Sequence, residues 1–138
     1  MADPEIVANG SITNDELNAL FAAAWADHKA RDFKPVLARS LVYFTAREDG
    51  YLIGFVNVAW DGGYHAFLLD PTVHPRFQRR GIGTHLVQQV ARAARAQGIE
   101  WLHVDFEQKL EKFYIGAGFR ATAAGVWNLA RSTVQPGT

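Results

Sequence analysis

Apolar side chains recur at helical spacing near the start of the chain. The positions that share one helix face are Leu17, Leu20, Phe21, Ala24 and Trp25. This spacing predicts an amphipathic helix. Residues 11–14 offer an N-cap before it, and Asp15 and Glu16 suit the positive end of the helix dipole. Pro35 then predicts a short second helix to Ala38, because proline is favoured at the first helical position.

Three runs rich in β-branched and aromatic residues follow, at residues 41–46, 51–60 and 64–69. Asp49-Gly50 separates the first two runs, and Asp61-Gly62-Gly63 separates the second from the third. An Asp-Gly pair between two such runs indicates a hairpin, because a type I′ turn needs positive φ at both central residues. The pattern therefore predicts an antiparallel meander of three strands.

In the second half of the chain, segments with the apolar repeat of a helix alternate with segments that have the two-residue repeat of a strand. A helix face carries Leu86, Val87, Val90 and Ala94, and Gly98 suits its C-terminal end. Residues 99–106 alternate as a strand, residues 110–117 form a last helix that stops at Gly118, and a final strand pair is expected around Phe119 and at 126–129. A strand, loop, helix and strand in succession imply one parallel pair in a mostly antiparallel sheet. We expect an α/β (α+β) fold with a mixed sheet of six to seven strands and about four helices.

Composition narrows the class of protein. The 138 residues are 49% hydrophobic and 12% aromatic, which indicates a single folded domain over residues 1–138. The formal net charge is zero, so no global field favours nucleic acid or an anionic membrane. The absence of cysteine excludes disulfides, zinc–thiolate sites and cysteine nucleophiles. Without a leader-like start or a long apolar run, the expected location is the cytoplasm.

Residues 73–86, VHPRFQRRGIGTHL, combine three arginines and two glycines at the start of a helix. A helix N-terminus presents unpaired N–H groups, and glycines let successive N–H groups converge. The natural ligand is a phosphate or pyrophosphate. No Gly-Lys-Ser/Thr follows, and Leu86 occupies the third glycine position of a dinucleotide fingerprint, so ATP and NAD are disfavoured. The alternative is that Gly81 and Gly83 only shape the turn.

Three motifs follow one another along the chain: Val73-His74-Pro75, then Gln78-Arg79-Arg80-Gly81-Ile82-Gly83, then Phe113-Tyr114 with Gly118-Phe119. Together they resemble the GNAT superfamily of N-acetyltransferases over about residues 41–129. The resemblance implies acetyl-CoA as cosubstrate, no metal, and a pantetheine arm lying where two strands splay apart. The cofactor-binding residues that it implies are Thr72, Val73, Gln78, Arg79, Arg80, Gly81, Ile82, Gly83, Thr84 and Phe113.

Tyr114 matches the family tyrosine that often protonates the departing thiolate. A phenol titrates near pH ~10 and a thiol near ~8.5, so the phenol is protonated at neutral pH and can donate as the sulfur gains charge. The alternative is a core aromatic that shares a helix face with Leu110 and Ala117.

The sequence departs from the family at several positions. Pro71 replaces a residue whose N–H often polarises the thioester carbonyl, and proline has no N–H. A bulge would pass that role to Val73 or Thr72. Phe67 stands where some members have a glutamate base, and Glu107 stands where the family often has an asparagine. The candidates for the base are Asp70, which we take as the catalytic candidate, and Asp105, Glu107, His65 and His74.

The resemblance puts the acceptor between the first helices and the strands. Trp25, Phe33 and Trp60 are the expected substrate-binding residues, beside Asp27, His28 and Asp32. These aromatics and acids would suit a cationic amine with an apolar body, in a small molecule or a peptide. They would equally suit ordinary core and surface. Many family members also pair through C-terminal strands, where Trp127 would serve a homodimer interface or else pack inside the protein.

Three hypotheses follow. The first is an N-acetyltransferase that moves an acetyl group from acetyl-CoA directly to a primary amine. The second is a non-catalytic acyl-CoA sensor of the same fold, which Pro71 and the missing carboxylate at Phe67 keep open. The third is another phosphorylated ligand in the glycine loop, such as a nucleotide. Neither nucleic acid nor a membrane is expected as a partner.

Overall fold

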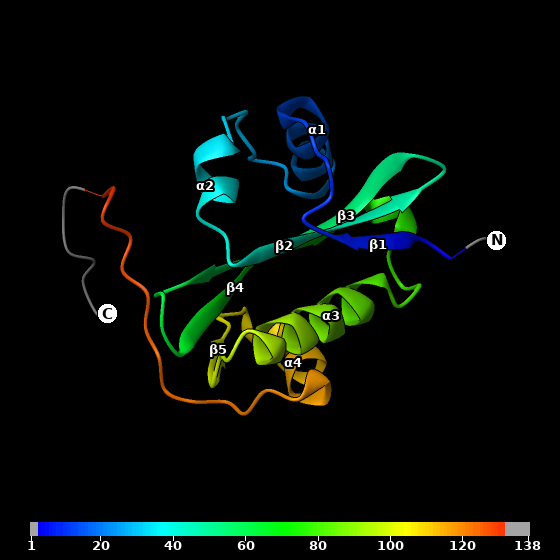
Figure 1. Ribbon diagram of the computed structural model, residues 1–138. Helices are drawn as coiled ribbons and strands as arrows, with labels where there is room; N and C mark the ends of the chain where they lie inside the picture. Colours follow the sequence, from blue (N-terminus) through cyan, green and yellow to red (C-terminus); the bar gives the residue numbers. More distant parts are fainter. Residues whose placement is uncertain (1–2, 132–138) are drawn as a thin grey trace. The chain divides into compact units, whose positions relative to one another are not determined.

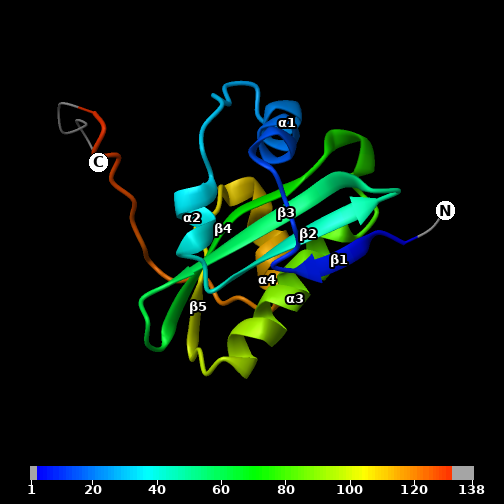
Figure 2. The same cartoon turned by 45° about the horizontal axis from the view of Figure 1, so that its top comes forward.

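One mixed sheet of five strands organises the fold (Figure 1). The computed structural model describes residues 3–131. The strands are β1 (Glu5–Ala8), β2 (Val42–Glu48), β3 (Tyr51–Trp60), β4 (His65–Val73) and β5 (Trp101–His103). They lie side by side in chain order (Figure 2). β4 and β5 pair in parallel, and the other neighbours pair antiparallel.

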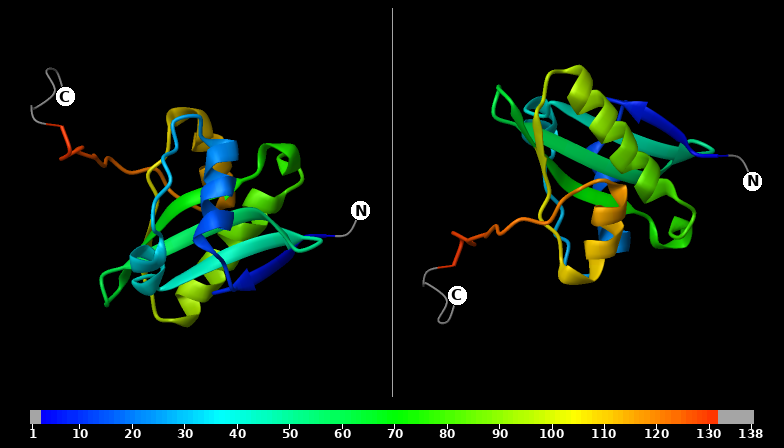
Figure 3. Two further views of the ribbon diagram at one scale, coloured as in Figure 1. Left: turned by 90° about the horizontal axis from the view of Figure 1, so that it is seen from above. Right: turned by 90° about the horizontal axis from the view of Figure 1, so that it is seen from below.

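Helices cover both faces of the sheet. Helices α1 (Asn14–Ala24) and α2 (Lys34–Ala38) lie on one face, and α3 (Ile82–Ala96) crosses the other (Figure 3). The chain divides into two compact parts after Val104. The second part contains α4 (Glu111–Ala117), preceded by the 3₁₀ turn η2 (Gln108–Leu110).

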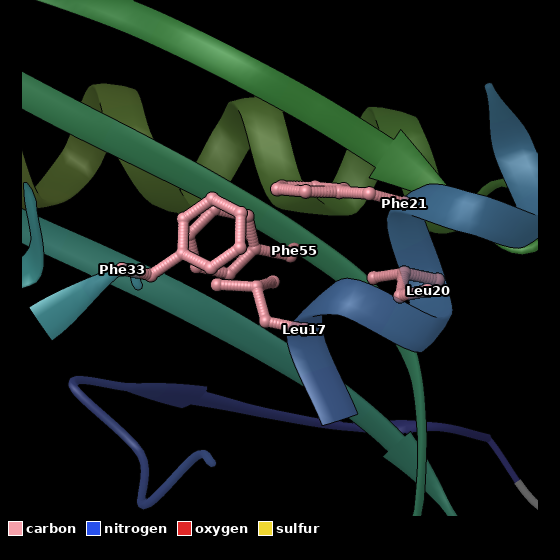
Figure 4. Packing of buried hydrophobic residues seen from close by; sticks show 5 residues of the cluster. All are labelled: Leu17, Leu20, Phe21, Phe33 and Phe55. Carbon is pink, nitrogen blue, oxygen red and sulfur yellow. The ribbon is translucent and has the colours of Figure 1, made fainter. Parts of the chain in front are cut away.

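An aromatic cluster fills the space between α1 and the sheet (Figure 4). The ring of Phe21 lies edge-on to Phe33 and Phe55, at centroid distances of 5.2 and 5.8 Å. Leu17 and Leu20 complete the buried set. Edge-to-face aromatic pairs add to the free energy gained from burial, so this cluster anchors α1 and the segment before α2 to β3.

Gly54 lets α3 approach the opposite face of the sheet closely. A Cβ at this position would lie 3.1 Å from the Cβ of Ala46 and 3.3 Å from Cδ1 of Leu86. Side chains alternate along a strand, so Val56 and Val58 also face α3, whereas Phe55 faces α1. Glycine is therefore required here for packing.

Most predicted elements are confirmed. The strand at 51–60 is present, the four helices form, and Asp49 and Gly50 have φ values of 50° and 83°, as a type I′ turn requires. The helix face of α3 is buried at the four expected positions. In addition, residues 5–8 form an edge strand that the short apolar start had not predicted.

The number of strands is a correction. The sheet has five strands instead of six to seven, and the described residues around Phe119 and at 126–129 form no strand. Val126, Trp127 and Leu129 are between 71% and 83% exposed. Apolar and β-branched residues form a strand only where a neighbouring edge accepts their hydrogen bonds, and local pattern does not specify that edge. The strand predicted at 99–106 is likewise shorter, at 101–103.

Arg47 ties the start of α1 to β2. Its guanidinium donates to both carboxylate oxygens of Glu16, at 2.6 and 3.0 Å, and to the carbonyls of Ser11 and Gly50, both at 2.9 Å. Glu16 also forms a capping box with Thr13. The hydrogen bond from Arg47 is the main cause that lowers the pKa of Glu16 from 4.5 to about 2.

We expect Glu16→Gln to destabilise the fold by about 1 kcal/mol at pH 7, a figure reduced for partial solvent exposure. The folded-state pKa of Glu16 lies below its unfolded value. The carboxylate's contribution is therefore fully present above pH 4.5 and is lost as pH falls toward 2. Urea unfolding of both proteins should show a gap in the free energy of unfolding that closes over this range. Glu100→Gln, at an exposed position, is the control. A gap that does not depend on pH would contradict the ion-pair assignment.

Candidate functional site

Strand β4 has an open edge over its second half. It pairs with β5 from His65 to Phe67, and within the described residues of the first part, no strand pairs with residues 68–73 on that side. The N–H of His74 donates to the carbonyl of Ile53 in β3 at 2.8 Å. Because successive residues point to alternate sides, the N–H and carbonyl of Val73 point to the open edge. The side chain of Gln78 donates to that carbonyl at 3.1 Å.

A β-bulge interrupts β4 at Asp70 and Pro71. Leu69 pairs with Asn57 and Thr72 pairs with Phe55, so two residues of β4 oppose one residue of β3. Asp70 has a φ of 54°, and its carbonyl accepts a hydrogen bond from Oγ1 of Thr72 at 2.9 Å. The expected bulge at Pro71 is therefore present. It places a residue without an N–H where no ladder hydrogen bond is needed.

The glycine loop leads from the turn η1 (Pro75–Phe77) into α3. Arg79 and Gly81 both have left-handed backbone, with φ values of 64° and 79°. Gly81 is the N-cap residue and α3 has no side-chain cap; a Cβ on Gly81 would meet nothing within 4 Å. The first hydrogen bond of the helix runs from the N–H of His85 to the carbonyl of Gly81 at 3.0 Å. The N–H groups of the three residues before His85 therefore have no acceptor within the helix.

Such a terminus fits an anion. The N–H groups of Ile82, Gly83 and Thr84 carry the positive end of a 15-residue helix. Thr84 is exposed and Gly83 is half-buried, whereas the side chain of Ile82 is buried in the core. Ile82 can thus contact a ligand only through its backbone.

The two loop arginines differ in their surroundings. Arg80 forms an ion pair with Glu48 of β2 at 2.8 Å, and its guanidinium lies 5.3 Å from the centre of the Phe77 ring. Arg79 is exposed, and within residues 3–131 its guanidinium forms no ion pair. Arg80 therefore holds the loop against the sheet, while Arg79 is available for an anionic ligand.

Tyr114 is buried among aromatic rings of the second part of the chain. Its ring stacks on Phe106 at 4.9 Å and meets Phe113 and Phe119 edge-on, at 5.0 and 5.8 Å. Burial, and then the negative charge of Asp105, raise the pKa of Tyr114 above its ordinary value of 10. The phenol is therefore protonated, as a proton donor must be. Phe113 is 37% exposed.

The candidate bases lie in different surroundings. Nδ1 of His74 accepts a hydrogen bond from the N–H of Arg76 at 3.1 Å, which leaves only Nε2 of its ring. Glu107 forms an exposed ion pair with Lys109 at 3.2 Å. Asp105 is exposed, and Asp70 sits at the bulge.

His65 has a partner that the sequence analysis did not single out. Its Nδ1 lies 2.7 Å from Nε2 of His103 on β5. The alternation of residues 99–106 indicates a strand with His103 on one face, but the pairing register that joins the two histidines is a tertiary feature.

The expected acceptor residues also fall into different surroundings. Trp25 stacks on Phe21 at 4.5 Å. Phe33 is only 5% exposed and belongs to the aromatic cluster beneath α1. Its ring therefore forms part of the packing between α1 and the sheet. Trp60 is 42% exposed at the end of β3.

The family model described as the Acetyltransferase (GNAT) family matches residues 11–119, which include the open edge of β4, the glycine loop and α4. The chain belongs to this family. Its sheet, with one parallel pair and four helices, is the α+β fold of GNAT proteins.

Similar proteins carry acetyltransferase names. An uncharacterized N-acetyltransferase, ycf52, of Gracilaria tenuistipitata var. liui is 25% identical over 76% of this chain and 60% of its own length. Mycothiol acetyltransferase of Nocardia farcinica is 33% identical over 75% of this chain and 32% of its own length. The aminoglycoside N-acetyltransferase AAC(6')-Iy, solved in complex with CoA, superposes with a TM-score of 0.73. That superposition has 23% identity and covers 91% of this chain and 93% of the other, and it shows a shared fold.

This chain thus spans 60% of the first relative and about a third of the second. Within residues 3–131, no helix is long and apolar enough to cross a membrane.

We expect Arg80→Ala to lower the melting temperature, because it removes the ion pair to Glu48 and the contact with the Phe77 ring. Arg79→Ala should leave the melting temperature nearly unchanged, because the left-handed backbone is about as costly for alanine as for arginine and no ion pair is lost. Thermal unfolding followed by circular dichroism compares the two variants with the parent protein. Equal melting temperatures for both variants would contradict the division of roles between the two arginines.

Proposed function

We propose that this protein is an N-acetyltransferase that moves an acetyl group from acetyl-CoA directly to a primary amine, with residues 1–138 acting as one catalytic domain. The observation that carries the proposal is the uncapped N-terminus of α3, preceded by a loop with two left-handed residues and next in sequence to the open edge of β4. A phosphate group at the helix and an extended amide-bearing arm at a strand edge match the two halves of coenzyme A.

The pyrophosphate would bind the N–H groups of Ile82, Gly83 and Thr84, with Arg79 adding a guanidinium. Hydrogen bonds from a helix terminus to an anion are charge-assisted and need no side-chain rearrangement. The left-handed residues hold the loop in this shape before the ligand arrives, so little ordering entropy is lost on binding.

The pantetheine arm would lie along the open edge of β4 like an added strand. Thr72 points its backbone toward β3, as His74 does, so Val73 is the residue whose N–H faces the arm. This alternation supports Val73 over Thr72 as the donor to the thioester carbonyl in place of Pro71. Bound acetyl-CoA supplies the activated acetyl group; the protein positions it and stabilises the oxyanion.

Tyr114 is proposed as the acid that protonates the departing thiolate. The resemblance to the family supplies this role, and the raised pKa of the buried phenol is consistent with it. The acceptor is proposed to be a primary amine in a small molecule or peptide, as for the aminoglycoside enzyme with the shared fold. Homodimerisation, with Trp127 at the interface, and a cytoplasmic location stay predictions.

Calorimetric titration tests the loop. We expect micromolar binding of acetyl-CoA and much weaker binding of ATP and NAD. Gly83→Val should weaken acetyl-CoA binding about tenfold or more, because a branched side chain would crowd the pyrophosphate (about 1.4 kcal/mol per tenfold). Gly125→Val is the matched control, since a Cβ there meets nothing within 4 Å. Equal affinity of Gly83→Val and parent would refute the loop assignment, and equal binding of all three ligands would favour a general phosphate site.

Steady-state turnover with an amine panel tests the acid and separates an enzyme from an acyl-CoA sensor. Tyr114→Phe keeps the ring stack and removes the proton, so kcat should fall about tenfold to a hundredfold with acetyl-CoA affinity unchanged. Because burial raises the pKa of the phenol, the parent should lose no activity from this group near neutral pH. Identical kcat values would refute the acid role. Binding without any amine-dependent release of CoA would favour the sensor.

A further inference from the structure

Four rings gather on the parallel pair β4–β5. The register sets His65 opposite Trp101 and Phe67 opposite His103. The two imidazoles are hydrogen-bonded at 2.7 Å, and the ring of Phe67 stacks on His103 at a centroid distance of 4.7 Å. All four side chains are exposed, Phe67 by 40% and Trp101 by 51%. We call these four residues the four-ring patch.

The four-ring patch lies on the sheet face that also carries α1. Gly54 faces α3, so Ala59, five residues later on β3, faces the other way. Ala59 pairs with Phe67, and paired residues share a face. Phe55, on the same face, packs against Phe21 of α1. The histidine pair is thus on the face opposite α3.

The contact between the two imidazoles has room for one added proton but not for two. In the neutral pair one ring nitrogen donates and the other accepts. One added proton converts the contact into a charge-assisted hydrogen bond. A second would make both facing nitrogens donors, which a distance of 2.7 Å does not allow. The carboxylate of Asp61, at the turn before β4, accepts a hydrogen bond from the backbone N–H of His65 at 3.3 Å and interacts electrostatically with the His65 side chain. Glu100, directly before β5, is exposed.

Acetyl transfer to an amine requires such a group. An amine like that of lysine is almost fully protonated at pH 7, with about one molecule in a thousand in the free-amine form. Phe67 cannot accept a proton, but Phe67 and Trp101 are partly exposed aromatic residues, and such rings attract an ammonium group through cation–π interaction. The patch therefore combines attraction for the ammonium with a proton acceptor.

We propose that the His65–His103 pair accepts the proton that the acceptor's ammonium group loses, an inference that rests on the proposed function. One ammonium proton passes through water to the pair, and the amine nitrogen forms a C–N bond with the thioester carbonyl. The C–S bond then breaks; in the net balance, the departing thiolate gains the second nitrogen proton, which is released as the amide forms. The bulge lies three residues beyond Phe67, which is a distance of about 10 Å along β4. This distance leaves space for the acceptor and for one or two water molecules that carry the proton.

The pH dependence of kcat/KM tests this role. The probes are acetyl-CoA with 2-phenylethylamine, tryptamine and a lysine tripeptide, using whichever reacts fastest. His103→Gln and His65→Gln should each lower kcat/KM about a hundredfold at pH 7 and far less near the pKa of the amine, where free amine is plentiful. Acetyl-CoA affinity should not change. His85→Gln, an exposed histidine of α3, is the matched control. Rates within about twofold of the parent, with the same pH profile, overturn the inference while leaving the proposed function intact.

Nuclear magnetic resonance of ¹⁵N-labelled imidazoles supplies a readout independent of turnover. In the parent, the two rings should titrate together, and His65→Gln should shift the titration of His103. Independent titration of the two rings overturns the pair. If the parent neither binds acetyl-CoA nor acetylates any probe amine, the proposed function fails first and the inference with it.

Discussion

Among the described residues, strand β4 has a neighbouring strand on both sides only from His65 to Phe67. The candidate site depends on the backbone groups of β4 beyond Phe67. Buried N–H and carbonyl groups need partners, so an unpaired strand edge either binds something or is capped. Gln78 reaches back from the glycine loop to the carbonyl of Val73. The bulge at Asp70 and Pro71 removes one N–H from the ladder altogether. What is left is a short edge that an extended ligand can use.

The glycine loop concentrates positive charge at the start of α3. The uncapped start of α3 has N–H groups without internal acceptors, and Arg79 adds to their positive charge. Arg80, by contrast, is held by Glu48 and Phe77. The charge of the loop is therefore divided between a group that fastens it to the sheet and a group that is open to an anion. The sequence alone shows two adjacent arginines and does not show which of them is held by an ion pair, because the partner Glu48 is 32 residues away in the chain.

Local signals predicted most of the fold. The Asp49-Gly50 turn, the apolar face of α3 and the capping residues of α1 are determined by neighbours within a few positions, and all appear as expected. Features set by distant partners were not predictable in the same way. The edge strand β1 exists because β2 accepts it, and residues 126–129 form no strand despite their composition. The bulge at Pro71 could be anticipated from the missing N–H. The contact of His65 with His103 depends on a parallel register that no local pattern encodes.

The position of Gly81 has a consequence for how this region can evolve. Gly81 marks the point where α3 begins, and Ile82, directly after it, is already part of the buried core. Each residue of an α-helix turns the chain by about 100°. An insertion or deletion that moved this starting point by one residue would rotate Leu86 and Val90 away from the sheet, and would expose what is now buried. The length of the anion loop is therefore coupled to the packing of the hydrophobic core: a substitution in the loop can leave the burial of α3 unchanged, whereas an insertion or deletion cannot.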